Sequence, residues 1–285
     1  MLRIGPCGWA YKDWDGIVYP AKKPKGFDRL AFLAQFFDAV EIDTSFYGPP
    51  RATSTKSWAE SISANPRFRF TAKLFRNFTH TRNATSKEEH DFKDGMMPLL
   101  ESGRFGALLL QFPWSFRYTP ENRAYVAGLH RRFSEFPLVL EVRHATWAEP
   151  DVLDFLADLG IGLCNIDQPL FHRSIKPGDQ VTSTIGYVRL HGRNYGKWFS
   201  ATALSHERYD YLYTPDELEP WVERLKKIER ETQDTYAMNN NHHIGKAITN
   251  GLEIKAMITG KPVPAPPLLV ARYPEIRGFV TESDA

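Results

Sequence analysis

The sequence has little net charge and no long apolar run. Its 36 Lys and Arg residues nearly balance its 34 Asp and Glu residues, which leaves a formal net charge of +2. A balance this close produces no whole-molecule field that would select nucleic acid or an anionic membrane as a partner. No apolar stretch approaches the roughly 20 residues that a membrane-spanning helix needs. We therefore expect no membrane partner.

Cysteine is also scarce. The two cysteines, Cys7 and Cys164, lie far apart in apolar segments. Two thiols placed in this way favour a reduced protein over a disulfide-stabilised one. The first residues, Met-Leu-Arg-Ile-Gly, contain no apolar signal segment and run directly into a strand-like stretch. A cytoplasmic protein is therefore expected.

Several motifs of catalysis and cofactor binding are missing. The sequence contains no Walker loop, no serine-nucleophile elbow and no Cys-x-x-Cys pair. The Gly-Pro-Cys-Gly-Trp segment at residues 5–9 lacks the third glycine of a dinucleotide-binding fingerprint. No short-spaced His/Glu motif is present, and the neighbours His242 and His243 do not form a chelate by themselves. We expect neither a metal ion nor an organic cofactor.

What the sequence does contain is a repeated supersecondary unit. Short β-rich runs alternate with helix-like segments, and two of these segments open with Thr-Pro followed by an acidic residue, at Thr119 and Thr214. Eight strands alternating with helices in about 260 residues predict an α/β protein with a single (β/α)₈ barrel, not a doubly wound open sheet. The predicted strands are Leu2–Gly8, Ala39–Asp43, Arg67–Lys73, Ala107–Phe112, Leu138–Arg143, Gly160–Asp167, Ile185–His191 and Thr235–Asn240.

No change in composition divides the chain. We expect one barrel domain over residues 1–261, with long, aromatic-rich loops after the strands. Four prolines fall in a short stretch after Lys261. Residues 262–285 are therefore expected to form a tail that lies extended on the surface or is partly disordered.

Polar side chains stand at the carboxyl ends of most predicted strands. Catalytic groups of a barrel come from these ends, and side chains of one parity point inward. Burying many charges at one end costs several kcal/mol per ion unless they are paired, so a ligand site is favoured there. A buried ion-pair network without catalytic duty is the alternative. The polar residues are Glu41, Asp43, Lys73, Gln111, Glu141, Arg143, Asn165, Asp167, Arg189, His191, Asn239 and Asn241.

The loops after the last two strands add a second signal. His191-Gly192-Arg193 follows one strand, and the segment 240–246, which ends in Gly245-Lys246, follows the other and opens a helix. Barrels often bind phosphate between these two loops through glycine amides and a helix N-terminus. We expect an anion there, held also by Arg193 and Lys246. A solvated loop with ordinary caps is the alternative.

Aromatic rings gather in the same predicted loops. Five of the seven tryptophans fall there, whereas Trp58 and Trp221 are expected to pack helices. Rings interleaved with lysine and arginine suit sugars, nucleobases or single-stranded nucleic acid. A small aromatic core formed by the loops themselves is the alternative.

A set of ordered motifs runs from about Gly5 to Ile258. In these motifs the chain resembles the YecE-like family, domain of unknown function 72, and the resemblance implies a (β/α)₈ barrel. The activity of that family is not established, so no reaction is implied. The matching segments are Gly5–Trp9 with Tyr11, Trp14 and Tyr19-Pro20, Val40–Tyr47, Phe70–Lys73, Thr79-His80, Leu109–Pro113, Leu140–His144 with Trp147, Tyr187–Gly192 and Asn239-Asn240.

The chain departs from the family pattern at two places. The family often has a small polar residue where this chain has Pro6-Cys7, and an Asn-Ser-like pair where it has Asp43-Thr44. Cys7 and Asp43 are therefore weaker site candidates than Glu41, Lys73, Glu141, Arg189, His191 and Asn240.

These observations predict a ligand site at the barrel mouth. The expected ligand is a phosphate-bearing sugar, a nucleotide or nucleic acid, and Glu141 or Glu41 would supply acid–base catalysis. Lys73 would stabilise negative charge or form a Schiff base. The alternatives are a nucleic-acid-binding protein without chemistry and a scaffold. The catalytic candidates are Glu41, Lys73, Glu141 and His191, and the substrate-binding candidates are Trp9, Tyr47, Gln111, Arg143, Trp147, Asp167, Arg189, Gly192, Arg193, Asn239 and Asn240.

Overall fold

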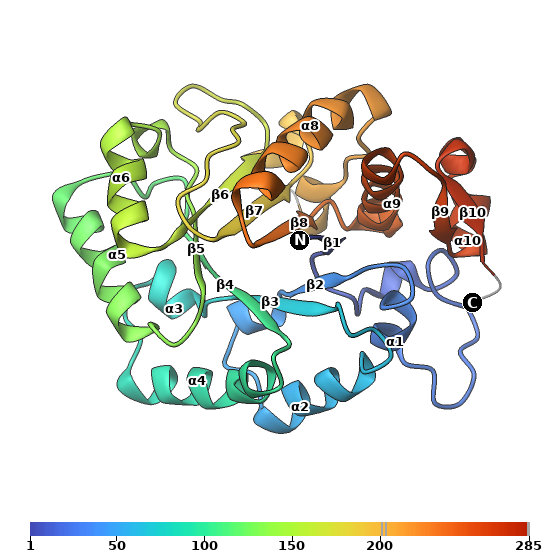
Figure 1. The fold of residues 1–285 in the computed structure, drawn as a ribbon, viewed down its shortest axis with the longest axis horizontal. Helices are drawn as coiled ribbons and strands as arrows, with labels where there is room; N and C mark the ends of the chain where they lie inside the picture. Colours follow the sequence, from blue (N-terminus) through green and yellow to red (C-terminus); the bar gives the residue numbers. More distant parts are fainter. Residues whose placement is uncertain (201, 203, 284–285) are drawn as a thin grey trace.

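Eight parallel strands, with helices around them, form a nearly closed barrel in the computed structural model (Figure 1). The structure describes residues 1–200, 202 and 204–283. The strand order is β1-β8-β7-β6-β5-β4-β3-β2. All eight predicted strands are confirmed, each with ends within two residues of the expected ones. The strands are β1 (Leu2–Pro6), β2 (Ala39–Ile42), β3 (Arg69–Lys73), β4 (Phe105–Gln111), β5 (Leu138–Glu141), β6 (Gly162–Asp167), β7 (Ile185–Leu190) and β8 (Asp234–Asn239).

The two helices whose start the sequence predicts begin at threonine caps. Thr119 accepts a hydrogen bond from the Asn122 amide at the start of α5, and Thr214 accepts one from Glu217 at the start of α8. No helix of the described residues is long and apolar enough to cross a membrane. The helices are α1 (Arg29–Leu33), α2 (Ala52–Ser61), α3 (Arg76–Thr79), α4 (Ser86–Glu101), α5 (Pro120–Arg132), α6 (Pro150–Leu159), α7 (Tyr195–Trp198), α8 (Pro215–Glu231), α9 (Lys246–Thr259) and α10 (Pro267–Arg272).

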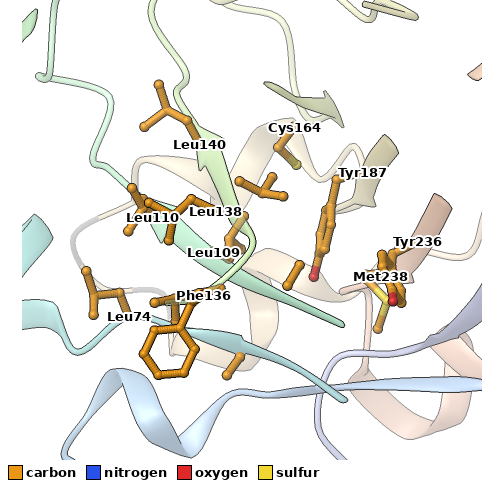
Figure 2. Packing of buried hydrophobic residues seen from close by; sticks show 14 of the residues in the cluster. Leu74, Leu109, Leu110, Phe136, Leu138, Leu140, Cys164, Tyr187, Tyr236 and Met238 are labelled. Atoms are coloured by element: carbon orange, nitrogen blue, oxygen red, sulfur yellow. The ribbon is translucent and has the colours of Figure 1, made fainter. Parts of the chain in front are cut away.

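Side chains fill the interior of the barrel on the amino-terminal side of the mouth. The ring centroids of Tyr187 and Tyr236 lie 5.9 Å apart, and both rings belong to a buried cluster with Leu109 (Figure 2). A Cβ atom on Gly106 of β4 would lie 2.3 Å from the Tyr236 hydroxyl, so this glycine makes room for a ring from the opposite side. The interior is therefore a packed core and not a pore.

The C-terminal segment differs from the expected extended tail. Residues 262–283 form β9 (Val263–Ala265), α10 and β10 (Val280–Glu282), and the two strands pair in parallel beside α9 (Figure 1). Val263 and Leu269 are buried in the same cluster as Leu252 of α9. The expectation of an extended or partly disordered segment is therefore wrong for these residues. The reason is that the apolar side chains between the prolines pack against α9. Residues 284–285 lie outside the described residues, and the domain boundary at residue 261 stays a prediction.

The barrel is joined least extensively between β1 and β2. The Gly8 amide donates to the Glu41 carbonyl at 2.9 Å, and the Asp38 amide lies 3.3 Å from the Ile4 carbonyl. A Cβ atom on Gly5 would lie only 1.8 Å from the Ala39 carbonyl oxygen. The absence of a side chain at Gly5 is therefore what lets these two strands approach.

Gly5→Ala is expected to lower the free energy of unfolding by about 3 kcal/mol or more, because the new methyl group meets backbone atoms that cannot move aside. Chemical denaturation measures the change. Gly128→Ala in α5 is the control, since its Cβ would meet only the end of Arg131 at 3.9 Å and alanine favours a helix by about 1 kcal/mol. Equal stability of the Gly5→Ala protein and the natural one would contradict this account of the contact between β1 and β2.

Candidate active site

A buried arginine lies at the centre of the barrel mouth. Arg189 of β7 places Nη1 at 2.5 Å from Glu141 Oε2 and Nη2 at 2.7 Å from Glu41 Oε1. All three side chains are fully buried. The Tyr187 hydroxyl lies 2.9 Å from the other Glu41 oxygen. Strands from three sides of the barrel are thus connected through one guanidinium, which supports the predicted inward orientation of Glu41, Glu141 and Arg189.

Glu141 has a cation or donor on each oxygen. Arg143 Nη2 lies 2.9 Å and His191 Nε2 lies 3.2 Å from Oε1, in addition to Arg189 on Oε2. Burial raises the pKa of Glu141, but Arg189, His191 and Arg143 outweigh burial and hold that pKa well below its usual value. Glu141 is therefore a permanent carboxylate with no proton to donate.

His191 is held as a neutral imidazole. Burial lowers the pKa of His191 to about 3. The Asn240 side-chain nitrogen lies 2.9 Å from His191 Nδ1. Because an amide nitrogen can only donate, Nδ1 accepts, and the ring proton sits on Nε2 facing Glu141. Asn240 thereby fixes both the tautomer and the orientation of the ring.

Lys73 of β3 carries the second ion pair of the mouth. Its Nζ lies 2.5 Å from Asp43 Oδ1 and 3.6 Å from Glu41 Oε1. Burial lowers the pKa of Lys73, but the negative charges of Asp43 and Glu41 raise it by a larger amount. The pKa of Lys73 therefore lies above its ordinary value. A lysine held in its charged form is a poor nucleophile, so a Schiff base is not favoured. Asp43, which the family pattern made a weaker candidate, is the direct partner of this cation.

The larger of two cavities at the mouth has a volume of about 500 Å³. The Tyr11 ring stacks on His242 with centroids 4.2 Å apart, and its hydroxyl lies 3.1 Å from Asp43 Oδ2. Burial lowers the pKa of His242 to about 4. The cavity therefore combines flat apolar walls with one ion pair. It is lined by Gly8, Trp9, Ala10, Tyr11, Asp43, Thr44, Tyr47, Trp58, Lys73, Tyr209, Asn240 and His242.

The smaller cavity, of about 220 Å³, is lined by two arginines, and no carboxylate of the described residues lines it. The Arg143 guanidinium lies 5.4 Å from the centre of the Trp198 ring. Among the described residues, the buried donors Arg208 Nε and Trp114 Nε1 have no hydrogen-bond partner. Tyr209 lines both cavities. The lining residues are His80, Gln111, Pro113, Trp114, Arg143, Trp198, Phe199, Arg208 and Tyr209.

Two strands present the opposite face from the one expected. Asp167 of β6 accepts from Trp221 Nε1 of α8 at 2.6 Å, so it points outward to the helix layer. Asn239 of β8 lies beside Gly251 of α9 and donates to the Gly5 carbonyl at 3.3 Å. The inward orientation predicted for Asp167 and Asn239 is wrong. In a parallel strand that is buried on both faces, polarity alone does not identify the inner one.

Other predicted binding residues make contacts that stabilise the loops. Trp147 is fully buried, stacks on Phe116 with centroids 5.3 Å apart and donates to the Phe116 carbonyl. Gly192 adopts a φ of +87° and its amide donates to the Tyr213 hydroxyl. Neither residue lines the two cavities. For Trp147 the alternative of an aromatic loop core describes the structure better than a ligand contact.

The structure does not assemble the anion site expected between the last two loops. Arg193 pairs with Asp167 at 2.6 Å and with Glu217 at 3.1 Å, and Lys246 pairs with Asp210. The Ile244 amide, close to the start of α9, donates to an Asp13 oxygen at 2.6 Å. Carboxylates of this chain thus occupy the groups that would have held a phosphate.

Several lining residues were not predicted from the sequence. Arg208 and Tyr209 come from the long segment between β7 and α8, and His80 follows α3. Trp58, expected to pack a helix, also lines the larger cavity with its ring centroid 5.1 Å from that of Trp9. The length and the aromatic content of the β7–α8 segment are the signals that point to it.

The carboxylates of the mouth pair with cations of this chain. Among the described residues, no group of three or more His, Cys, Asp or Glu side chains is arranged to hold a metal ion. Glu41, Asp43 and Glu141 each face a lysine or arginine of this chain instead.

Glu141→Gln is expected to lower the free energy of unfolding by about 3–5 kcal/mol, because it leaves Arg189 buried with one carboxylate in place of two. Thermal and urea unfolding measure the loss. Glu149→Gln, at an exposed position before α6, is the matched control and should change little. A Glu141→Gln protein as stable as the natural one would show that Arg189 does not need the pair.

Stability is expected to fall as the pH drops below about 6.5. His191 has a folded pKa of about 3 against an ordinary value of 6.5, so in this window the unfolded chain binds a proton that the folded protein does not. His191→Gln should flatten the dependence by up to ~1.4 kcal/mol per pH unit. Denaturation between pH 7 and pH 5 measures the slope. The exposed His90→Gln serves as control, and an unchanged slope in His191→Gln would refute the assignment.

Comparisons with known proteins agree over nearly the whole chain. The family described as "Protein of unknown function DUF72" matches residues 3–269. The UPF0759 protein YunF of Bacillus subtilis (strain 168) is 30% identical over 275 residues, covering 90% of this chain and 95% of the relative. Solved DUF72 structures from Thermotoga maritima MSB8 and Enterococcus faecalis V583 are 29% and 26% identical, each with a TM-score of 0.79 and 91% of this chain covered, and 99% and 96% of those chains. The chain therefore belongs to the DUF72 family of proteins of unknown function.

Proposed function

We propose that the barrel mouth binds a small anionic ligand that also carries a ring, such as a sugar phosphate or a nucleotide. In this proposal Arg143 and Arg208 hold the anionic group in the smaller cavity. The ring lies against the aromatic walls of the larger cavity, which shares Tyr209 with the smaller one. The observation that carries the proposal is the smaller cavity, which two arginines line and which no carboxylate lines within the part of the chain that the structure describes.

The charge balance of the mouth favours an anion over a cation. The inner network contains three carboxylates (Glu41, Asp43 and Glu141) and three cations (Lys73, Arg143 and Arg189), so it is neutral. Arg208 adds a further positive charge, and no ion pair involving it is found among the described residues. Guanidinium groups bind phosphate or carboxylate through paired, charge-assisted hydrogen bonds.

The geometry assigns different duties to the predicted catalytic residues. Glu41 and Glu141 are fully buried and line neither cavity, so in this proposal they are positioning residues for Arg189, Lys73 and Arg143. Lys73 does line the larger cavity and remains charged, which suits it to stabilise negative charge that develops on a ligand. Acid–base catalysis by Glu141 or Glu41 is therefore the less favoured form of the proposal.

The test compares ligands with and without phosphate. Ribose 5-phosphate and AMP should raise the melting temperature of the protein, whereas ribose should not. A ligand at about 100 times its Kd adds roughly 2.7 kcal/mol of stability. Arg208→Met should weaken binding of the phosphate-bearing ligands by about tenfold, as measured by calorimetry, because it removes a charge-assisted contact.

Arg131→Met is the matched control, since Arg131 is exposed on α5 and lines neither cavity. Binding that falls equally in Arg208→Met and Arg131→Met would reject the site. A short single-stranded oligonucleotide is the third probe. Affinity that appears only for the oligonucleotide and falls steeply with salt would favour a nucleic-acid-binding protein over a small-molecule site.

A further inference from the structure

Three arginines meet at the amino-terminal end of the barrel, opposite the mouth. Arg3 lies in β1, Arg69 begins β3 and Arg104 immediately precedes β4. Arg3 is 4% exposed, and the other two are half-buried. Burial lowers the pKa of Arg69, and the positive charges of Arg3 and Arg104 lower it further. The Arg69 guanidinium is thus close enough to those of Arg3 and Arg104 to be repelled by both.

Backbone carbonyls hold these arginines in place. Arg104 Nη1 donates to the Asn65 carbonyl at 2.8 Å, and Arg69 Nη1 donates to the Pro66 and Phe68 carbonyls at 2.9 Å. Arg3 Nε donates to the Arg67 carbonyl at 2.8 Å. Four consecutive carbonyls of the α2–β3 connection therefore orient the guanidinium groups, and neutral carbonyls do so without cancelling the positive charges.

The carboxylates nearby do not balance this cluster. Asp234 pairs with Arg3 at 2.5 Å, and Asp38 lies 3.5 Å from the exposed Arg67. Within the described residues Arg69 and Arg104 have no ion pair, and no hydrogen bond from Nη2 of either is found. Asp234 is the one carboxylate that pairs with these three guanidinium groups among the described residues, so two of the positive charges have no carboxylate partner there.

We propose that Arg3, Arg69 and Arg104 form a second anion site, which binds a phosphate-type oxyanion at the amino-terminal end of the barrel. Phosphate at neutral pH carries up to two negative charges, which matches the excess of the cluster. Its oxygens accept the paired N–H groups that a guanidinium presents. Because the carbonyls already fix the side chains, binding requires little further ordering.

This site is independent of the function proposed for the mouth. Arg69 and Lys73 stand at the two ends of the same strand, and none of the three arginines lines either cavity at the mouth. Inorganic phosphate is the first probe, titrated against the protein at constant ionic strength with sodium chloride. Calorimetry measures the affinity, and the melting temperature reports stabilisation.

Arg69→Met and Arg104→Met should each weaken phosphate binding by about tenfold or more, because each removes a charged fork from the site. Arg69→Lys should recover only part of the affinity, since lysine restores the charge without the fork. Arg67→Met is the matched control at the same end, because it removes an exposed, paired arginine. Circular dichroism without phosphate checks that each variant is folded, and Arg104→Lys replaces any variant that is not.

Retention of phosphate binding in Arg208→Met, together with its loss in Arg69→Met, supports the site. Three results overturn it. They are loss in Arg208→Met alone, an equal loss in Arg67→Met, and a response to phosphate no larger than the response to chloride. Ribose 5-phosphate titrated into Arg208→Met then separates two sources of the same chemistry. If ribose 5-phosphate still binds and the further change Arg69→Met removes that binding, the site accepts a phosphate ester. If ribose 5-phosphate does not bind, the site is restricted to free phosphate.

Discussion

The barrel mouth depends on one guanidinium held between two carboxylates. Arg189 reaches Glu41 and Glu141 from the interior face of β7, and all three groups are excluded from water. Ion pairs at such depth rarely add much to stability, because desolvation offsets most of their attraction. What they do provide is position. Removal of one member leaves the buried network with an excess charge, so the complete set of charges favours this one arrangement.

The other charged groups of the mouth are arranged on two sides of these three residues. On one side Glu141 fixes Arg143 and the His191 ring, and Asn240 orients that ring from the far side. On the other side Glu41 and Asp43 share Lys73. The floor is therefore a rigid, neutral network, whereas the walls come from α2, which carries Trp58, and from the long β7–α8 segment, which carries Trp198, Tyr209 and Arg208. A rigid floor beneath loop-built walls is how barrels combine a fixed chemistry with a variable ligand.

The sequence predicted the architecture more fully than the site. Strand positions follow from local β-rich runs, so all eight could be predicted. Orientation could be predicted where a charge has no outward partner, as for Glu41, Glu141 and Arg189, but not for Asp167, whose outward partner Trp221 lies 54 residues away. The roles of Arg208 and Tyr209 depend on how a long loop folds back over the barrel, and no periodic pattern encodes that path. The prolines of the C-terminal segment predict an extended chain, whereas its buried leucine and valine side chains pack against α9.

The buried cluster of Arg189, Glu41 and Glu141 also limits how the sequence of such a protein can change during evolution. Loss of the Glu41 or Glu141 carboxylate leaves the neutral network with one excess positive charge, and loss of Arg189 leaves it with one excess negative charge. Each single replacement passes through an unstable intermediate, so these positions are expected to be replaced together or to stay as they are. Arg208 and Tyr209 of the β7–α8 segment belong to no such ion-pair network among the described residues. New ligand preferences can therefore arise by substitution at the rim while the charged floor is inherited unchanged.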